Sequence, residues 1–344
     1  MNKKVIITGI AGQDGSYLAE FLLSKGYDVH GIIRRVVFEN QDDQDKKFFR
    51  IKHLIDKITL HYGDVTDYSM LKLVIAKVKP DELYHLAAQS RVDISFKDDF
   101  SVFHVNTDST HYILSALKEL KPDCRFYFAG TSDMFGNAVE APQNEKTPFN
   151  PVSPYGISKL ASYHLTRVYR EAYGIFACSG ILFNHESPRR GLEFVTKKIT
   201  ATVAKIKRGL EKELQLGDLD ANRDWGFAGD YIKAMWKVLQ QNEPEDYVIG
   251  TGENHTVREF VEIAFWSVGI EIEWHGKGVG ERGVDKKMGK TLVVVDEKWF
   301  RPIDINELKA DATKARQKLD WRPKISFDEL VKMMVDSDLK GVSK

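Results

Sequence analysis

Tyr155 and Lys159 lie four residues apart in the segment Tyr-Gly-Ile-Ser-Lys, and Thr131 and Asp133 precede them in the chain. If the segment is helical, Tyr155 and Lys159 share one face. An ammonium beside a phenol favours the phenolate, so we expect the pKa of Tyr155 to lie below its usual value of about 10. Such a tyrosine can take a proton from a sugar hydroxyl while a nicotinamide accepts hydride. Thr131 can donate to the same oxygen, and Asp133 adds a carboxylate for a separate proton transfer.

The N-terminus supports this chemical interpretation, although a tyrosine and a lysine at this spacing also occur by chance on helices. Residues 4–8 predict a short buried strand, and a glycine-rich turn separates it from a helical pattern at 16–25. Strand, glycine turn and helix in this order are the context of a dinucleotide-binding fingerprint. Gly9 would make the tight turn, Gly12 would admit the pyrophosphate, and Gly15 would let helix pack on strand. A turn without a ligand is the alternative.

The end of the second predicted strand, 28–33, indicates which dinucleotide is bound. Arg34 and Arg35 follow this strand directly. An acidic residue there would hold a ribose 2′-hydroxyl, whereas an arginine suits a 2′-phosphate, so we predict NADP rather than NAD. A solvated basic pair is the alternative. The ends of the next two strands are expected to supply further cofactor contacts: Asp64, Val65, Leu86, Ala87, Ala88, Gln89 and Ser90.

The composition limits the possible partners. Lys plus Arg and Asp plus Glu number 50 each in the 344 residues, so net charge gives no reason to expect a nucleic acid or a membrane. We see no signal peptide or membrane-spanning run, and expect a cytoplasmic enzyme. Cys124 and Cys178 fall in or beside predicted strands and are expected to be small core residues rather than a disulfide. The histidines have no zinc-like spacing, so no metal is predicted.

The strand pattern predicts an α/β fold. Helical patterns separate the predicted strands, which are 4–8, 28–33, 58–62, 81–86, 125–130 and 176–183. This alternation indicates a Rossmann-type, doubly wound parallel sheet. We expect residues 1–183 to form an NADP-binding domain, to which some later segments return, and residues 184–344 to form mainly a smaller mixed α/β lobe for substrate.

The later part of the chain is less regular. We expect helices at 193–208, 228–240 and from Phe327 to Leu339, and a short strand at 214–216. The stretch from Val36 to Arg50 is highly charged, and it predicts an exposed loop or part of a helix.

Several segments resemble the GDP-mannose 4,6-dehydratase family of extended short-chain dehydrogenases, over nearly the whole chain. They are Thr8–Leu18, Ser153–Tyr155, Gly180–Pro188, Arg223–Gly226 and Thr251–Glu253. The run Ile-Leu-Phe-Asn-His-Glu-Ser-Pro within Gly180–Pro188 is the most specific of them.

The resemblance implies a closed redox cycle. Tyr155 would deprotonate the sugar 4-hydroxyl as NADP takes the C4 hydride, with Thr131 steadying the oxygen. The 4-ketone acidifies the proton at C5, and Asp133 would move that proton to the departing 6-hydroxyl. Hydride returned to C6 then gives a 4-keto-6-deoxy sugar, so the cofactor stays bound.

The resemblance also implies the binding residues. Lys159, Gln13, Asp14, His185 and Arg190 would contact the cofactor. The GDP-sugar, our expected partner, would meet a second set: Ser90, Ser132, Asn184, Lys198, Arg223 and Arg301. Arginines suit a diphosphate, although each one taken alone could be a surface ion pair. In the family a loop after the arginine pair reaches the adjoining subunit, which implies a homodimer or homotetramer.

The departures from the family pattern leave the substrate open. Asp133 stands where the family usually has glutamate, and Gly130 and Phe128 replace the more usual serine and glutamine. Aspartate is one methylene shorter, and a displacement of roughly an ångström can cost about a hundredfold in rate. GDP-D-glycero-α-D-manno-heptose is therefore an alternative substrate to GDP-mannose. A GDP-sugar 4-oxidase, reductase or epimerase without dehydration, and a non-catalytic NADP sensor, are the alternative functions.

Overall fold

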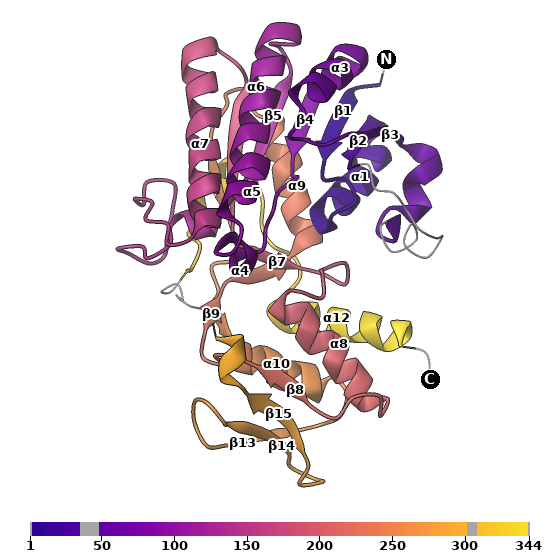
Figure 1. The fold of residues 1–344 in the computed structure, drawn as a ribbon, viewed down its shortest axis with the longest axis vertical. Helices are drawn as coiled ribbons and strands as arrows, with labels where there is room; N and C mark the ends of the chain where they lie inside the picture. The colour runs from indigo at the N-terminus through magenta and orange to yellow at the C-terminus, as the bar shows by residue number, and fades with distance from the viewer. Residues whose placement is uncertain (1, 35–47, 301–307, 343–344) are drawn as a thin grey trace.

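A parallel β-sheet forms the centre of the larger domain (Figure 1). The computed structural model describes residues 2–34, 48–300 and 308–342. Within them, seven strands pair in the order β11-β6-β5-β4-β1-β2-β3. Their bounds are β1 Lys4–Thr8, β2 Asp28–Ile33, β3 Thr59–Tyr62, β4 Glu82–His85, β5 Arg125–Thr131, β6 Ala177–Leu182 and β11 Tyr247–Ile249. The predicted doubly wound α/β fold is confirmed, and six of the seven strands were expected to within one residue at each end.

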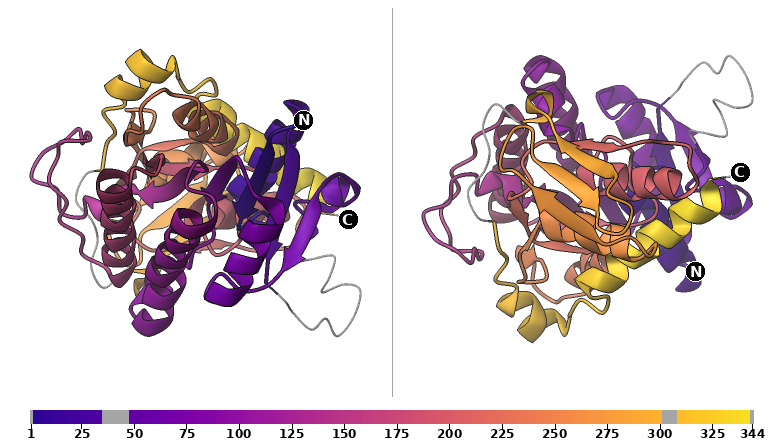
Figure 2. Two further views of the ribbon diagram at one scale, coloured as in Figure 1. Left: turned by 90° about the horizontal axis from the view of Figure 1, so that it is seen from above. Right: turned by 90° about the horizontal axis from the view of Figure 1, so that it is seen from below.

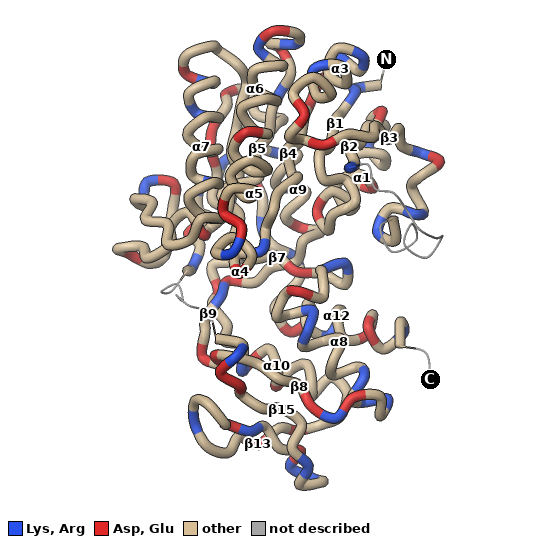
Figure 3. Tube along the Cα trace, viewed as in Figure 1, with Lys and Arg blue, Asp and Glu red and all other residues tan. Residues whose placement is uncertain are grey.

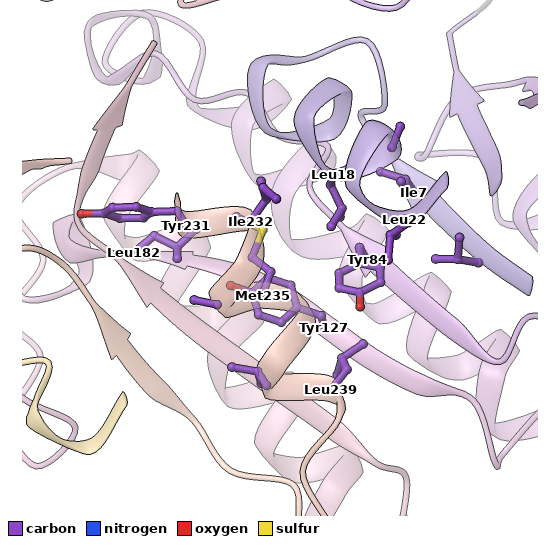
Figure 4. Packing of buried hydrophobic residues seen from close by; sticks show 14 of the residues in the cluster. Ile7, Leu18, Leu22, Tyr84, Tyr127, Leu182, Tyr231, Ile232, Met235 and Leu239 are labelled. Atoms are coloured by element: carbon purple, nitrogen blue, oxygen red, sulfur yellow. The ribbon is translucent and has the colours of Figure 1, made fainter. Parts of the chain in front are cut away.

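Helices cover both faces of this sheet (Figures 1 and 2). Side chains alternate along each strand, so Val5 and Ile7 of β1 belong to one hydrophobic cluster while Ile6 belongs to another. The first cluster, part of which is drawn in Figure 4, is completed by α1 (Gln13–Ser24) and α9 (Ala228–Leu239). The second includes residues of three helices: α3 Tyr68–Val78, α6 Ser109–Leu120 and α7 Pro154–Tyr173. Two buried layers therefore fix the sheet in place.

The strand order reverses beside β1. This strand pairs with β2 on one side and with β4 on the other, both in parallel. In an open α/β sheet, the crevice outside the carboxyl ends of the strands at such a switch point is where ligands bind. The predicted glycine turn after Thr8 and the segment after His85 both start at this edge.

A smaller lobe lies below the main sheet in Figure 1, and the view from below in Figure 2 places its orange strands in front. It has a four-stranded sheet in the order β13-β14-β15-β8, packed with three helices around a third hydrophobic cluster. The strands are β13 Ile272–His275, β14 Arg282–Asp285, β15 Thr291–Val295 and β8 Leu214–Leu216. The helices are α8 Val195–Lys207, α10 Val257–Trp266 and α12 Phe327–Gly341.

Two short strand pairs connect this lobe to the main domain. β7 (Asn184–Glu186) pairs in parallel with β10 (Trp225–Phe227), and β9 (Asn222–Arg223) pairs antiparallel with β12 (His255–Thr256). The other short elements are η1 Lys52–Lys57, α4 Val92–Ser95, α5 Asp99–Phe103, η2 His104–Asp108, η3 Ser132–Met134, η4 Glu297–Trp299 and α11 Thr313–Leu319.

Acidic and basic residues are interspersed over both parts of the molecule (Figure 3). None of the helices in the described ranges has the length and apolar character that a membrane span needs.

Candidate active site

The glycine turn is closed against the end of β4. Gly9 has a φ of +72°, which favours glycine, and a Cβ there would lie 2.9 Å from the amide nitrogen of Ala87. A Cβ on Gly15 would lie 2.3 Å from the carbonyl oxygen of Gly9, so helix and turn touch at this point. Gly12 caps α1 without a side-chain hydrogen bond. The first amides of α1 are therefore available to an anion, which fits a pyrophosphate.

α1 begins three residues earlier than expected. We predicted a helix from Ser16, whereas the first helical residue is Gln13. The apolar spacing that marks a buried helix starts later, because the first turn carries the polar pair Gln13 and Asp14 and the glycine that packs on the turn. The correction places both polar side chains at the helix N-terminus.

Thr131 and Asp133 lie together where β5 ends. Thr131 Oγ1 donates to Asp133 Oδ2 at 3.0 Å and accepts from the Asp133 amide at 3.2 Å. The single turn η3 starts at Ser132, which is buried, with Thr131 as its N-cap. The cap holds the hydroxyl and the carboxylate side by side.

Tyr155 and Lys159 lie one turn apart in the first part of α7, as expected. Ser153 caps this helix by accepting from the amide of Gly156 at 3.0 Å, and Pro154 occupies the first turn. Tyr155 and Lys159 are both buried.

The amine of Lys159 donates to the carbonyl oxygen of Ala129 at 2.8 Å and lies 4.8 Å from the ring centre of Phe128. Burial lowers the pKa of Lys159 to about 7, against a small raising effect of the Asp14 charge. Close to neutral pH this amine is therefore only partly protonated.

The expected lowering of the Tyr155 pKa is wrong for this structure. Burial of the phenol raises its pKa, and the Asp133 carboxylate raises it further. A hydrogen bond with Thr131 and the charge of Arg190 act in the opposite direction and are outweighed. The reason is that the lysine amine is bonded to a backbone carbonyl on β5, and desolvation penalises a phenolate more than these neighbours stabilise it.

The segment after β6, which contains β7 and the loop that follows it, brings several expected cofactor residues to the first turn of α1. His185 Nε2 lies 2.8 Å from Asp14 Oδ2, and Gln13 donates to the backbone carbonyl of His185 at 3.0 Å. Arg190 lies 3.0 Å from Glu186 and acts electrostatically on Asp14 and His185. Gln13, Asp14, His185 and Arg190 thus form one polar cluster beside α1.

The segment after β4 is fixed by buried side chains. The amides of Leu86 and Ala87 both donate to Thr8 Oγ1 at 3.1 Å. The amide of Gln89 donates to the side chain of Asn106 at 2.8 Å, and Asn106 in turn donates to Ser158 Oγ at 3.0 Å. Asn106 therefore connects the expected cofactor segment to the turn of α7 between Tyr155 and Lys159.

Sequence reasoning missed Asn106. It lies in the π-helical turn η2, and no spacing rule marks such a turn in advance. The sequence around Asn106, residues 104–111, is a mostly polar run that gives no signal of its own for a buried amide.

The remaining cofactor candidates follow β2, β3 and β4. Asp64 Oδ1 accepts from the amide and hydroxyl of Thr66 at 3.0 and 2.8 Å, which orders the turn after β3. Val65 is buried, Ala88 is partly buried and Arg34 is exposed. Arg35 lies outside the described residues.

The expected substrate residues are distributed over both parts of the molecule. Lys198 on α8 has its amine 3.1 Å from the ring centre of Trp299, and burial together with the Lys298 charge lowers its pKa to about 8. Arg223 lies on β9 and donates to the carbonyl oxygen of Asn222 at 2.7 Å. Asn184 is partly buried on β7 and Ser90 is exposed. Arg301 lies outside the described residues.

Cys124 and Cys178 are buried and free, as expected. Across residues 2–34, 48–300 and 308–342, no three His, Cys, Asp or Glu side chains are grouped so that they could hold a metal ion.

A Rossmann sheet with a glycine turn after β1, and with a buried tyrosine and lysine on α7 beside Thr131, defines an extended short-chain dehydrogenase. A family model described as GDP-mannose 4,6 dehydratase matches residues 6–334. The chain belongs to the GDP-mannose 4,6-dehydratase family.

Relatives of similar length agree with this assignment. The GDP-mannose 4,6 dehydratase of Homo sapiens is 51% identical over 97% of this chain and 91% of its own length. That of Drosophila melanogaster is 50% identical over 100% of this chain and 88% of its own. Among solved structures, the UDP-glucose 4-epimerase of Thermus thermophilus, a complex with NAD, has a TM-score of 0.78 at 25% identity, covering 98% of this chain and 100% of that one. The fold is thus one that holds a nicotinamide cofactor.

Proposed function

We propose that this protein converts GDP-mannose to its 4-keto-6-deoxy form, with NADP retained through the cycle. The observation that carries the proposal is the Thr131–Asp133 pair placed beside Tyr155, because it puts a hydroxyl donor and a carboxylate next to the expected oxidation base. A simple alcohol dehydrogenase needs only one acid–base group, whereas loss of water across C5 and C6 needs a second.

The residues fit a nicotinamide dinucleotide. The first turn of α1 has no side-chain cap, and Gly9 lies close to Ala87, so backbone amides are available at the place expected for the pyrophosphate. When bound, the cofactor would take up hydride from C4 and return it at C6. Arg34, at the end of β2, supports NADP over NAD because a guanidinium pairs well with a 2′-phosphate.

The protein groups would move three protons. Tyr155, which has to lose its own proton first to act as a base, removes the proton of the 4-hydroxyl while Thr131 donates a hydrogen bond to that oxygen. Asp133 takes the proton from C5 once C4 is a ketone, and delivers it to the 6-hydroxyl, which leaves as water. After hydride reaches C6, C5 takes up one proton, equal in number to the one that Tyr155 removed, which completes the 4-keto-6-deoxy sugar and restores the starting protonation of the protein. Lys159, one turn further along α7, would position the nicotinamide ring and the ribose attached to it.

A GDP-linked manno-heptose is the second candidate substrate. At Gly130 a Cβ would lie 2.9 Å from the carbonyl oxygen of Gly180 and 3.1 Å from Met134 Cε. The serine usual in the family would therefore require a shift of β5 or β6. Gly130 and the shorter Asp133 both leave more room beside the expected sugar position than the serine and glutamate usual in the family. This supports a substrate with a longer carbon chain than mannose.

The test is incubation of the purified protein with GDP-mannose or with GDP-D-glycero-α-D-manno-heptose, without added NADPH. Loss of one water from either sugar, read by mass spectrometry, supports dehydration and identifies the substrate. A change of two hydrogens alone would instead indicate an oxidase or reductase, and an unchanged mass with altered chromatography an epimerase. If neither sugar changes and no nucleotide copurifies, the catalytic proposal is wrong and a sensor role is favoured.

Assembly, domain division and location complete the proposal. We infer a homodimer or homotetramer, a division near residues 183 and 184, and a cytoplasmic location. The segment expected to reach a neighbouring subunit falls largely in 36–47, outside the described residues. Light scattering on the purified protein measures the assembly directly.

A further inference from the structure

An ion pair joins the first turn of α1 to β7, one of the short strands that connect the smaller lobe to the main domain. Asp14 lies in the first turn of α1, and His185 lies on β7. Oδ2 of Asp14 and Nε2 of His185 are 2.8 Å apart, and both side chains are largely buried, with exposed fractions of 21% and 12%. Between them they span 171 positions of the chain.

The hydrogen bonds determine the proton count on His185. Its Nδ1 lies 2.8 Å from the carbonyl oxygen of Phe183, which can only accept, so Nδ1 carries a proton. Its Nε2 faces a carboxylate oxygen of Asp14, which also accepts when ionised. Both ring nitrogens are therefore donors, and His185 is an imidazolium. The pair carries no net charge in this state.

Neighbouring groups hold this arrangement. Gln13 donates from one amide nitrogen to Asp14 Oδ1 at 3.1 Å and to the carbonyl oxygen of His185 at 3.0 Å, and its Oε1 accepts from Ser187 at 2.8 Å. The ring of Tyr231 stacks on His185 with centres 4.7 Å apart and planes 25° from parallel. The imidazolium cannot turn away from Asp14 without breaking these contacts.

The other charged or titratable groups that act on the pair come from four elements and one loop. They are Arg190 in the loop after β7, Lys159 and Tyr155 on α7, Tyr127 on β5, Tyr231 on α9 and Tyr17 on α1. Lys159, with a pKa of about 7, also titrates near neutrality and has to be separated from the pair in any test.

We propose that His185 is a positioning residue that neutralises Asp14 beside the pyrophosphate site, so that protonation of His185 controls how tightly the cofactor is retained. The inference rests on the proposed NADP site. An anionic side chain in the first turn of α1 competes with a bound pyrophosphate for the same positive helix terminus. When His185 is charged, it cancels the repulsion between the Asp14 carboxylate and the pyrophosphate. When His185 is neutral, this repulsion weakens cofactor binding.

The pH window follows from the two shifts. Burial alone would lower the pKa of His185, but the charge and hydrogen bond of Asp14 outweigh it, and the pKa is raised from 6.5. Burial alone would raise the pKa of Asp14, but His185 outweighs it, and the pKa is lowered from 3.8. Both members of the pair are therefore charged between pH 3.8 and pH 6.5. As pH rises above 6.5 and through the raised pKa of His185, the imidazolium loses its proton and Asp14 is left unpaired.

Two matched variants separate the charges from the contacts. Asp14→Asn keeps an acceptor for His185 but removes the anion, and His185→Gln keeps a donor for Asp14 but removes the cation. The measurement is the dissociation constant of NADPH, followed by its fluorescence, at about pH 6.5 and about pH 9. Lys159 and the cofactor phosphate titrate in the native protein and in both variants, so each variant is compared with the native protein at the same pH.

The expected pattern differs for the two variants. His185→Gln binds NADPH roughly tenfold more weakly than the native protein at the lower pH and equally at the higher pH, because both proteins then hold an unpaired Asp14. Asp14→Asn binds as well as the native protein at the lower pH and roughly tenfold more tightly at the higher pH. Equal weakening by both variants at both pH values would reduce the pair to a structural contact and overturn the proposal.

A second measurement does not depend on the cofactor. Proton–carbon NMR of protein labelled at histidine Cε1, with the His185 signal assigned by its absence from His185→Gln, gives the titration of this ring. We expect its midpoint above 6.5, and a lower midpoint in Asp14→Asn. A ring that is already neutral below pH 6.5 would contradict the ion pair. If the midpoint is raised as expected but the protein binds no NADPH, only the proposed function is contradicted.

Discussion

Thr131 Oγ1 lies 3.0 Å from Oδ2 of Asp133, and it donates a hydrogen bond to that oxygen. The hydroxyl expected to steady the sugar oxygen is thus engaged with the carboxylate expected to remove the C5 proton. Substrate binding has to exchange this contact for contacts with the sugar, so the two groups are positioned as a unit.

The first prediction concerns the division of labour between Asp133 and Tyr155. Asp133→Asn should slow loss of water by about 10²- to 10⁴-fold, because proton transfer at C5 has no base, while oxidation at C4 continues. The reduced cofactor should then accumulate, which its near-ultraviolet absorbance detects. Asp336→Asn, an exposed aspartate on α12, is the matched control and should be silent. Normal turnover by Asp133→Asn would refute the role given to this carboxylate.

The second prediction is a trade between stability and activity at Lys159. Because its pKa is lowered to about 7, the folded state binds its proton less tightly than the unfolded state does. Lys159→Met should therefore raise the free energy of unfolding by about 1–3 kcal/mol near neutral pH while abolishing sugar oxidation. The gain should shrink as pH rises from 7 towards the unfolded value of about 10.4, because the folded-state lysine is already neutral there and the lysine of the unfolded state becomes progressively easier to deprotonate. Urea unfolding at several pH values measures it, and the exposed Lys97→Met should change little.

The parallel strands could be predicted because their apolar runs and glycine turn are local. Gly15 has to be glycine because of a contact with Gly9, and Gly9 because of a contact with Ala87 after the neighbouring strand β4. The spacing of the glycines in the turn indicates both requirements. Tyr155 and Lys159 share a helix, so their spacing alone placed them together. The protonation of Tyr155 could not be predicted in this way, because it depends on burial and on Asp133 and Arg190, which come from other segments.

Contacts between distant segments were beyond sequence reasoning. The pairing of Asp14 with His185 joins residues 171 positions apart, and nothing in either segment indicates the other. Asn106 was missed for the same reason, since its partners Gln89 and Ser158 lie on two other segments. The small sheet of the second lobe was predicted only in part, since the strand at 214–216 was expected and matches β8, whereas β13, β14 and β15 were not located.

The third prediction uses two arginines on α7. Arg170 holds Asp246 with two hydrogen bonds of 2.9 and 2.8 Å, and Asp246 also accepts from the amide of Ser179 at 2.7 Å. Arg170→Ala leaves this carboxylate without its cation, so we expect a loss of about 3 kcal/mol in unfolding free energy. Arg167, whose partner Glu171 is exposed, is the control, and Arg167→Ala should leave the urea midpoint unchanged. Equal effects of the two substitutions would argue against a buried ion pair.

The fourth prediction concerns the substrate diphosphate. If Lys198 binds it, the lowered pKa of about 8 means that the cation is lost as pH rises above that value, so KM for the GDP-sugar should increase there. Lys198→Arg keeps the charge and should remove this increase, whereas Lys198→Ala should raise KM roughly tenfold below pH 8 and differ little from the native protein well above it. Lys205→Ala, exposed on the same helix, should behave as the native protein. A pH-independent KM in the native protein would exclude Lys198 from the diphosphate site.

The position of β11 in the chain has a consequence for synthesis on the ribosome. This strand covers the edge of β6 by pairing Tyr247–Ile249 with Gly180–Leu182, although more than sixty residues separate the two. Until residue 249 has left the exit tunnel, the nascent chain presents β6 as an open strand edge, which can pair with another chain. Chaperone protection of the growing polypeptide is therefore needed longest at this edge, and a gene fragment that stops before Tyr247 should yield aggregated protein.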